Sequence, residues 1–195
     1  MHIWPEHALG VFNLWLLMVL YSVPILLTIR LRKRVFHSTS SHFSRSRGSC
    51  RYRFFVGSKI FMLIYFLYAI VIPIRCETPS AGIGIILYIV GFTIYSAAWW
   101  TVATSAHGSI FSKGPFRFSR HPIYLSTAIQ FIGAGLISQS WFYLILSILV
   151  GLSHLYNAWA EERICVDVFG DEYKRYMNHT PRWFGWPVRQ SNHSR

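Results

Sequence analysis

Two charged clusters flank the last two apolar segments of this chain, and together they have the chemistry to hold a small charged ligand. The first is the motif Gly-Pro-Phe-Arg-Phe-Ser-Arg-His-Pro-Ile-Tyr at 114–124, which brings Arg120 and His121 to the start of an apolar segment. The second is the carboxylate pair Glu161-Glu162, which follows the next apolar segment. Charge without a partner is costly close to lipid, so both clusters point to a ligand or to each other.

A link of only a few residues, 138–140, joins the apolar segments 123–137 and 141–160. A connection this short forces two helices into an antiparallel hairpin, whose free ends then lie side by side. The sequence therefore predicts that His121 and Glu161 are neighbours.

The carboxylate pair is predicted to close its helix, where negative charge opposes the helix dipole. Arg120, Arg163 or a bound cation would compensate for it, and an ordinary ion pair at a helix end explains the same residues. Pro122 fits the first turn of the other helix, because its missing N–H is not needed there. His121 then stands at that helix N-terminus, either as a capping or structural residue or as part of a polar pocket.

His154 lies seven residues before Glu161, on the same helical face. Histidines within membrane segments usually face the protein interior. The sequence favours a hydrogen bond to another helix, with substrate contact as the alternative; Asn157 and Gln130 are weaker cases of the same kind. The spacing of the histidines gives no support for a metal site.

The composition indicates an all-α membrane protein with a single domain. Of 195 residues, 53% are hydrophobic and only 13% are charged, against about 25% charged in soluble domains. The apolar blocks approach the ~20 residues that a membrane-spanning helix needs. We expect a bundle of about five transmembrane helices in one domain, 1–195, with an N-terminal part at 8–103 and a hairpin with its cover at 112–187. The predicted spans are 8–29, 61–74 (with 54–56 before it), 81–103, 123–137 and 141–160, followed by a short amphipathic helix at 169–176.

The placement of the cations predicts the topology. Of the 19 lysines and arginines, only Arg75 falls in a loop that five spans would put opposite the others. The positive-inside bias places the N-terminus outside, with the C-terminus and both charged clusters in the cytoplasm. The basic loop 30–59 would also contact anionic lipids, at about 1 kcal/mol per cation. Nucleic-acid binding is excluded, because no aromatic side chains alternate with these cations on a folded platform.

Small residues in segment 81–103 recur at helical spacing and predict close helix packing. The glycines at 82 and 84 do not follow a strand, so a dinucleotide-binding turn is excluded. Three scattered cysteines predict neither a disulfide framework nor a zinc site. The first apolar segment lacks a basic flank and is expected to remain as a membrane helix. The small residues are Ala81, Gly84, Gly91 and Ala98, and the cysteines are Cys50, Cys76 and Cys165.

The region after the hairpin has an aromatic, proline-bearing segment at 180–187. Trp183 and Trp186 suit a membrane interface, and Arg182 offers a donor fork to a carboxylate. Together with the helix at 169–176, this segment either covers the cytoplasmic mouth of the hairpin or serves as a simple surface anchor.

The order of these motifs over Ser112–Pro187 resembles the integral-membrane methyltransferases. That superfamily holds isoprenylcysteine carboxyl methyltransferase and the phospholipid (phosphatidylethanolamine) N-methyltransferases. The resemblance implies a membrane-embedded enzyme with an S-adenosylmethionine site at the cytoplasmic end of the hairpin. The implied catalytic residues are His121 and Glu161, and the implied cofactor-binding residues are Arg120, His121, Pro122, Tyr124, Glu161, Glu162, Tyr173, Tyr176 and Arg182.

Two departures from the family stand out. Ser126 stands where members often have glycine, and the chain reads Gly-Phe-Thr-Ile at 91–94, where the phosphatidylethanolamine enzymes have a glycine-rich motif. The acceptor stays open between an isoprenylcysteine-type carboxylate, a phospholipid amine and a small thiol. A carboxylate is already ionised, whereas an amine must pass a proton to His121 or to a glutamate of the pair. A non-catalytic scaffold or small transporter is the alternative of another class, although no internal repeat supports it.

Overall fold

The computed structural model describes residues 3, 7–31, 50–106 and 109–187, with the backbone alone for 50–55. This part of the chain forms six α-helices and one 3₁₀ turn, and it contains no strand. The elements are α1 (Trp15–Leu31), α3 (Cys50–Tyr68), α4 (Pro79–Thr104), η1 (Gly114–Arg117), α5 (Pro122–Ile137), α6 (Trp141–Phe169) and α7 (Asp171–His179).

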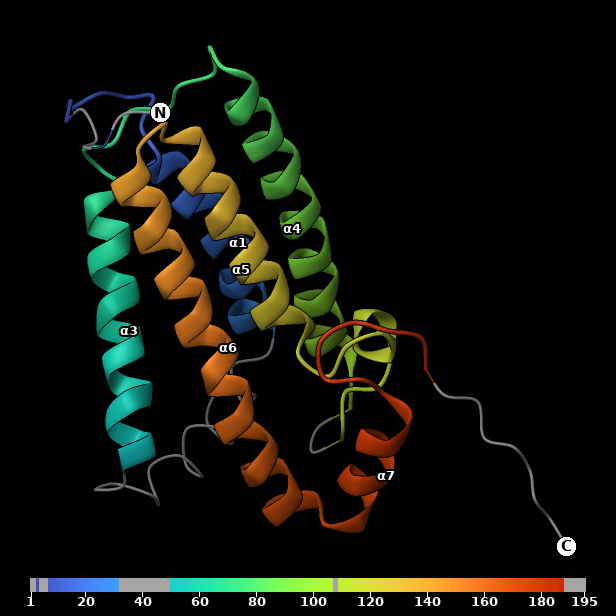
Figure 1. The fold of residues 1–195 in the computed structure, drawn as a ribbon. Helices are drawn as coiled ribbons and strands as arrows, with labels where there is room; N and C mark the ends of the chain where they lie inside the picture. The colour runs from blue at the N-terminus through green and yellow to red at the C-terminus, as the bar shows by residue number, and fades with distance from the viewer. Residues whose placement is uncertain (1–2, 4–6, 32–49, 107–108, 188–195) are drawn as a thin grey trace, which may run out of the picture.

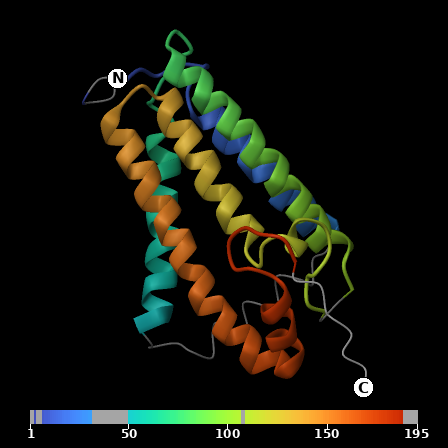
Figure 2. The same ribbon diagram turned by 45° about the vertical axis from the view of Figure 1, so that its right-hand side comes forward.

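The five long helices form a bundle, and its two ends carry different connecting elements. α4 begins at one end of the bundle, where α5 also turns into α6, and η1 and α7 lie at the other end (Figure 1). α5 lies between α4 and α6 in both ribbon views (Figures 1 and 2). The end with η1 and α7 is therefore where the two charged clusters of the hairpin lie.

The predicted close packing of small residues is confirmed between α4 and α5. A Cβ added to Gly84 would lie 2.7 Å from the carbonyl oxygen of Gly133, and one added to Gly91 would lie 2.9 Å from that of Ser126. Gly82 faces open space, so it takes no part in this contact. The two backbones touch along one seam, and all four predicted small residues (Ala81, Gly84, Gly91 and Ala98) are buried.

Two helices, α4 and α6, are long and apolar enough to cross a membrane. α1, α5 and the apolar part of α3 (Val56–Tyr68) fall short of that length. The all-helical fold class is thus confirmed, whereas the count of five spans remains a prediction.

The first and second predicted spans are wrong at one end each. Residues 8–14 and 69–74 are not helical but lie beside each other, with the Leu14 amide donating to the Ile72 carbonyl at 2.9 Å. The amide of Asn13 donates to carbonyls of both stretches, at 2.5 and 2.6 Å. An asparagine side chain that bonds to nearby backbone competes with helix formation. α1 therefore begins later, and α3 ends earlier, than hydropathy alone predicts.

The predicted loop at 30–59 is also shorter than expected. α1 runs to Leu31 and α3 already begins at Cys50, so residues 50–59 are helical. The part of the basic loop at 32–49 lies outside the described residues.

The fifth predicted span continues well past the carboxylate pair. α6 ends only at Phe169, before Gly170, which has φ 55°. Glycine adopts this left-handed backbone at little cost, and it commonly ends helices. The expectation that Glu161 and Glu162 close the helix is therefore wrong. The predicted amphipathic helix is confirmed as α7, which starts directly after Gly170.

Candidate active site

The hairpin brings the two charged clusters together, as its short link predicts. α5 begins at Pro122, so His121 is the residue just before the helix. α6 runs past this point, and its Glu162 lies opposite. The His121 Nε2 and Glu162 Oε1 atoms are 3.1 Å apart.

Glu162 lies at the centre of an ion cluster with Arg120, His121 and Arg182. Its side chain is buried, with 3% of the residue exposed. Arg182 donates from Nε to both carboxylate oxygens at 3.2 and 3.1 Å, and from Nη2 at 2.6 Å. The Nε of Arg120 lies 3.2 Å from Oε1, as an ion pair without a directed hydrogen bond. Burial, rather than the helix dipole, is what makes partners necessary here. Arg163, the other predicted partner, is exposed.

Glu161 is more exposed than Glu162 and has fewer partners among the described residues. Its side chain is 34% exposed, and its Oε2 lies 3.8 Å from the Nδ1 of His121. That distance is too long for a hydrogen bond. The phenol of Tyr124 also interacts with this carboxylate. Glu161 thus retains capacity to accept hydrogen bonds, whereas the oxygens of Glu162 are occupied.

Aromatic rings lie next to these charges. The His121 ring centre lies 5.8 Å from that of Tyr124 and 6.1 Å from that of Trp183. The Tyr124 ring is in turn 6.2 Å from the ring of His154. This row of rings can accept a flat or cationic ligand through its π faces.

His154 faces the interior, as expected, but its bonding differs from the prediction. Its Nδ1 pairs with the carbonyl of Val150 at 3.0 Å, within α6 itself. Asn157 makes the kind of interhelical bond that the sequence favours for His154, donating to Ser58 of α3 at 2.9 Å. Gln130 donates within its own helix.

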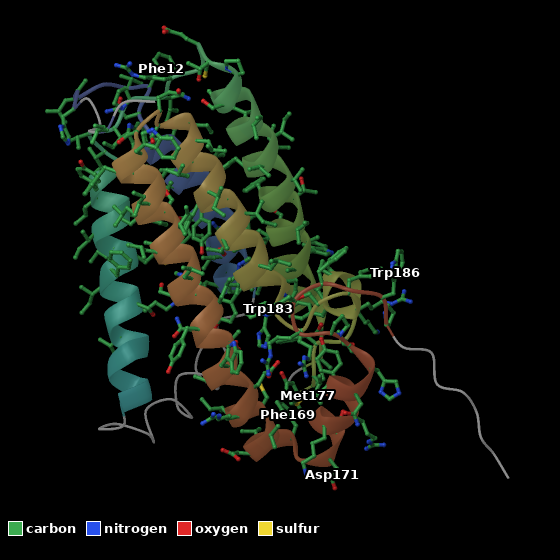
Figure 3. The ribbon with its side chains drawn as sticks, in the orientation of Figure 1. Phe12, Phe169, Asp171, Met177, Trp183 and Trp186 are labelled. Carbon is green, nitrogen blue, oxygen red and sulfur yellow. The ribbon has the colours of Figure 1, made fainter. Side chains whose placement is uncertain are left out.

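The segment after α7 is docked on the turn before α5. The Arg120 amide donates to the Pro181 carbonyl, and the Gly185 amide donates to the Phe118 carbonyl, both at 3.0 Å. Trp183 lies beside the lower end of α5, whereas Trp186 is at the outer edge (Figure 3). The segment therefore lies across the mouth of the hairpin, which favours the cover over the simple surface anchor.

Tyr173 and Tyr176 of α7 lie beside each other, with their ring centres 5.7 Å apart. The Tyr176 hydroxyl donates to the Phe116 carbonyl at 2.7 Å, which fixes η1 against α7. Burial raises the pKa of both phenols above the ordinary tyrosine value. Both hydroxyls therefore remain protonated at neutral pH, so Tyr176 keeps donating this bond.

Two contacts were missed by the sequence reasoning. Trp159 lies three residues before Glu162, and its ring centre is 4.2 Å from the guanidinium carbon of Arg182. Ser119 is buried and accepts from the His121 amide at 3.1 Å. The helical spacing of Trp159 from the carboxylate was the available signal.

Within the described residues, no three His, Cys, Asp or Glu side chains gather as a metal site would need.

Ser126 stands where family members often have glycine, and its side chain is accommodated within α5. It is fully buried, and its hydroxyl donates to the Pro122 carbonyl at 2.6 Å. The close approach of α4 at this level comes from Gly91 instead. The hydroxyl is therefore satisfied within α5.

Comparison with known families supports the resemblance. A family model described as phospholipid methyltransferase matches residues 80–172, from the start of α4 to the start of α7. The matched range includes the hairpin and both glutamates, and it ends before Arg182. No curated protein matches the chain.

Proposed function

Because a family model described as phospholipid methyltransferase matches residues 80–172, we propose that this protein transfers methyl groups from S-adenosylmethionine to a lipid-soluble acceptor. The acceptor is a phospholipid amine or an isoprenylcysteine-type carboxylate. The observation that carries the proposal is the carboxylate of Glu161. Its side chain is partly exposed and lies beside His121, on which the segment after α7 is docked.

The residues present fit the groups of this cofactor. The Nε of Arg120 is buried and lacks a hydrogen-bond acceptor, so it suits the carboxylate of the cofactor. Glu161 would accept from the amino group or the ribose hydroxyls. The rings of Tyr124 and Trp183 would contact the sulfonium, since π faces attract cations. Glu162 would act indirectly, by holding Arg120 and His121 in position.

The chain also offers a proton acceptor for an amine. When bound, S-adenosylmethionine supplies an electrophilic methyl group, which leaves its sulfur as the acceptor's lone pair forms the new bond. Donation from Nε2 of His121 to Glu162 leaves the lone pair of the neutral imidazole on Nδ1. Nδ1 can then take the amine proton, with Glu161 3.8 Å away to stabilise the resulting cation. A carboxylate acceptor needs no such base.

We further propose that the bundle spans the membrane five times, with the site at the cytoplasmic face. The charge asymmetry of the loops and the length of α4 and α6 support this arrangement. Positioning of two bound reactants and exclusion of water would then supply much of the rate enhancement, about 7–11 kcal/mol in favourable cases.

The test uses purified protein, methyl-labelled S-adenosylmethionine and two candidate lipids. Label in a base-labile ester identifies a carboxylate acceptor, and label in a choline-type head group identifies an amine. Calorimetry with the cofactor alone tests the first step. Absence of binding heat, together with absence of label in either lipid, would contradict the proposal and favour a scaffold or transporter.

A further inference from the structure

The segment after α7 has an inner and an outer side. The ring of Trp183 lies 6.1 Å from the ring of His121, so this side chain faces the candidate site. By contrast, Phe184 and Trp186 are 77% and 80% exposed. Within the described residues Phe184 makes no ring contact, and the ring of Trp186 meets that of Phe118 at 5.5 Å. The outer side thus presents two large apolar side chains on one short segment.

This outer side lies at the end of α4. The Gly185 amide donates to the carbonyl of Phe118, which directly follows η1. A Cβ added to Gly114 of η1 would lie 2.6 Å from the Oγ1 of Thr101, in the last turn of α4. η1 therefore lies against the end of α4 (Figure 1), and Trp186 is at the outer edge of the same end of the bundle (Figure 3).

In the membrane arrangement proposed above, the length of α4 places this end among lipid head groups. α4 has 26 residues, which makes it about 39 Å long, against a hydrocarbon core of about 30 Å. Trp100, near the end of α4, is 65% exposed, and tryptophan is enriched at the depth of the head groups. The exposed rings of the segment after α7 would then lie at this depth.

The same surface carries positive charge without a counterion from the protein. Lys113 and Arg117, just before and within η1, are both exposed. Neither forms an ion pair within the part of the chain that the structure describes. Arg117 directly precedes Phe118, whose ring meets that of Trp186. Cations beside exposed aromatic rings are complementary to an anionic leaflet, which attracts basic residues and accepts the rings at its interface.

We propose that the outer side of the segment after α7 binds the anionic head-group region of the bilayer, with Phe184 and Trp186 among the head groups and Arg117 beside lipid phosphates. The inference rests on the membrane arrangement proposed above and goes beyond the methyl-transfer reaction. Because Trp183 lies on the inner side of the same segment, the bilayer would stabilise the docked position of the segment. The segment is then both a cover and an anchor, the two alternatives that the sequence left open.

Hydrogen exchange at the Arg120 amide measures this docking, because the amide donates to the Pro181 carbonyl. The test uses the full chain without cofactor, in nanodiscs of phosphatidylcholine alone or with added phosphatidylserine. Phe184→Ser should accelerate the exchange about tenfold with either lipid, because an apolar side chain no longer holds the segment at the interface. Phe184→Leu should retain most of the protection. Phe12→Ser is the matched control, since Phe12 is also 77% exposed but lies at the opposite end of the bundle (Figure 3).

Arg117→Gln tests the role of charge. Exchange at the Arg120 amide should become about fivefold faster in discs with phosphatidylserine, which corresponds to about 1 kcal/mol for one cation. It should stay unchanged with phosphatidylcholine alone. Unaltered exchange in Phe184→Ser overturns the inference, as does an effect of Arg117→Gln that is the same with and without phosphatidylserine.

The two proposals fail separately, because the exchange measurement uses neither cofactor nor acceptor. Exchange results that overturn the anchor leave the proposed methyl transfer intact. Absence of cofactor binding and of label in either lipid overturns the proposed methyl transfer, while the exchange pattern of Phe184→Ser and Arg117→Gln still decides the anchor.

Discussion

Arg182 and Glu162 form a forked ion pair, with the Arg182 Nη2 2.6 Å from Oε2 and its Nε 3.1 Å from the same oxygen. The pair connects the segment after α7 to the C-terminal part of α6. Because Glu162 also meets Arg120 and His121, one buried carboxylate joins three parts of the site. The stability of the cover and the position of the histidine therefore depend on the same residue.

Glu162→Gln should destabilise the fold. The amide cannot neutralise the guanidinium of Arg120, which is buried beside it. Removing one partner of a buried ion pair typically costs about 3–5 kcal/mol. Thermal unfolding in detergent micelles would measure the loss, with Glu161→Gln as the control, for which less than about 0.5 kcal/mol is expected. Equal losses in the two variants would contradict the different states that the structure gives these glutamates.

Glu161→Gln should weaken S-adenosylmethionine binding without unfolding the protein. Its carboxylate is 34% exposed and would lose a charged contact to the cofactor. A tenfold weaker Kd or more is expected, since hydrogen bonds to charged groups contribute about 1.5–3 kcal/mol. Calorimetry on the folded variant provides the measurement. The structure thus gives different surroundings to two glutamates that are adjacent in the sequence.

Arg182→Met should loosen the cover while the helices stay folded. The fork to Glu162 is lost, but the backbone bonds at Arg120 and Gly185 remain. Hydrogen exchange at these two amides should accelerate, because local opening becomes easier when side-chain contacts are removed. Arg175→Met, on the exposed face of α7, should leave the exchange unchanged. Unaltered protection in Arg182→Met would mean that the fork does not hold the cover.

His121→Asn should distinguish the two acceptors. If the acceptor is an amine, loss of the proton acceptor on Nδ1 should lower kcat by about 10²–10⁴. If it is a carboxylate, which is already ionised, kcat should fall much less. Single-turnover measurements with each lipid would show this difference. The same large loss with a carboxylate acceptor would indicate that His121 positions the cofactor instead.

Gly91→Ala should destabilise the seam between α4 and α5. The new methyl group would lie 2.9 Å from the Ser126 carbonyl oxygen, a backbone atom that cannot easily move. Overpacking of this kind costs about 1–3 kcal/mol. Gly82→Ala is the matched control, since nothing lies within 4 Å of its added carbon and alanine favours a helix. The thermal midpoint should fall in the first variant and stay level or rise in the second.

The hairpin and the meeting of its ends were predictable from the sequence for local reasons. A link at 138–140 leaves no geometry other than an antiparallel pair, and Pro122 marks a helix start. The close packing of α4 was also predictable, because helical spacing alone puts its small residues Gly84 and Gly91 on one face. Each of these inferences needs only a few neighbouring residues.

The ends of the first two spans could not be predicted from the sequence, because they depend on contacts between distant parts of the chain. Residues 8–14 are apolar enough for a helix, yet Asn13 bonds to the carbonyl of Ile70 instead. Hydropathy cannot register this competition, because the partner lies far away in the sequence. For α6, apolar composition ends near the carboxylate pair, but the helix continues to Gly170, where a left-handed backbone ends it.

By itself the sequence determined which residues meet at the end of the hairpin, because helix periodicity and a short link are local properties. Only the tertiary structure decided that Glu162 is buried in an ion cluster while Glu161 stays half open. Adjacent residues on a helix point about 100° apart, so identical side chains receive different surroundings. Which of them faces Arg182 depends on how the cover docks on the turn before α5, and that packing involves the whole bundle.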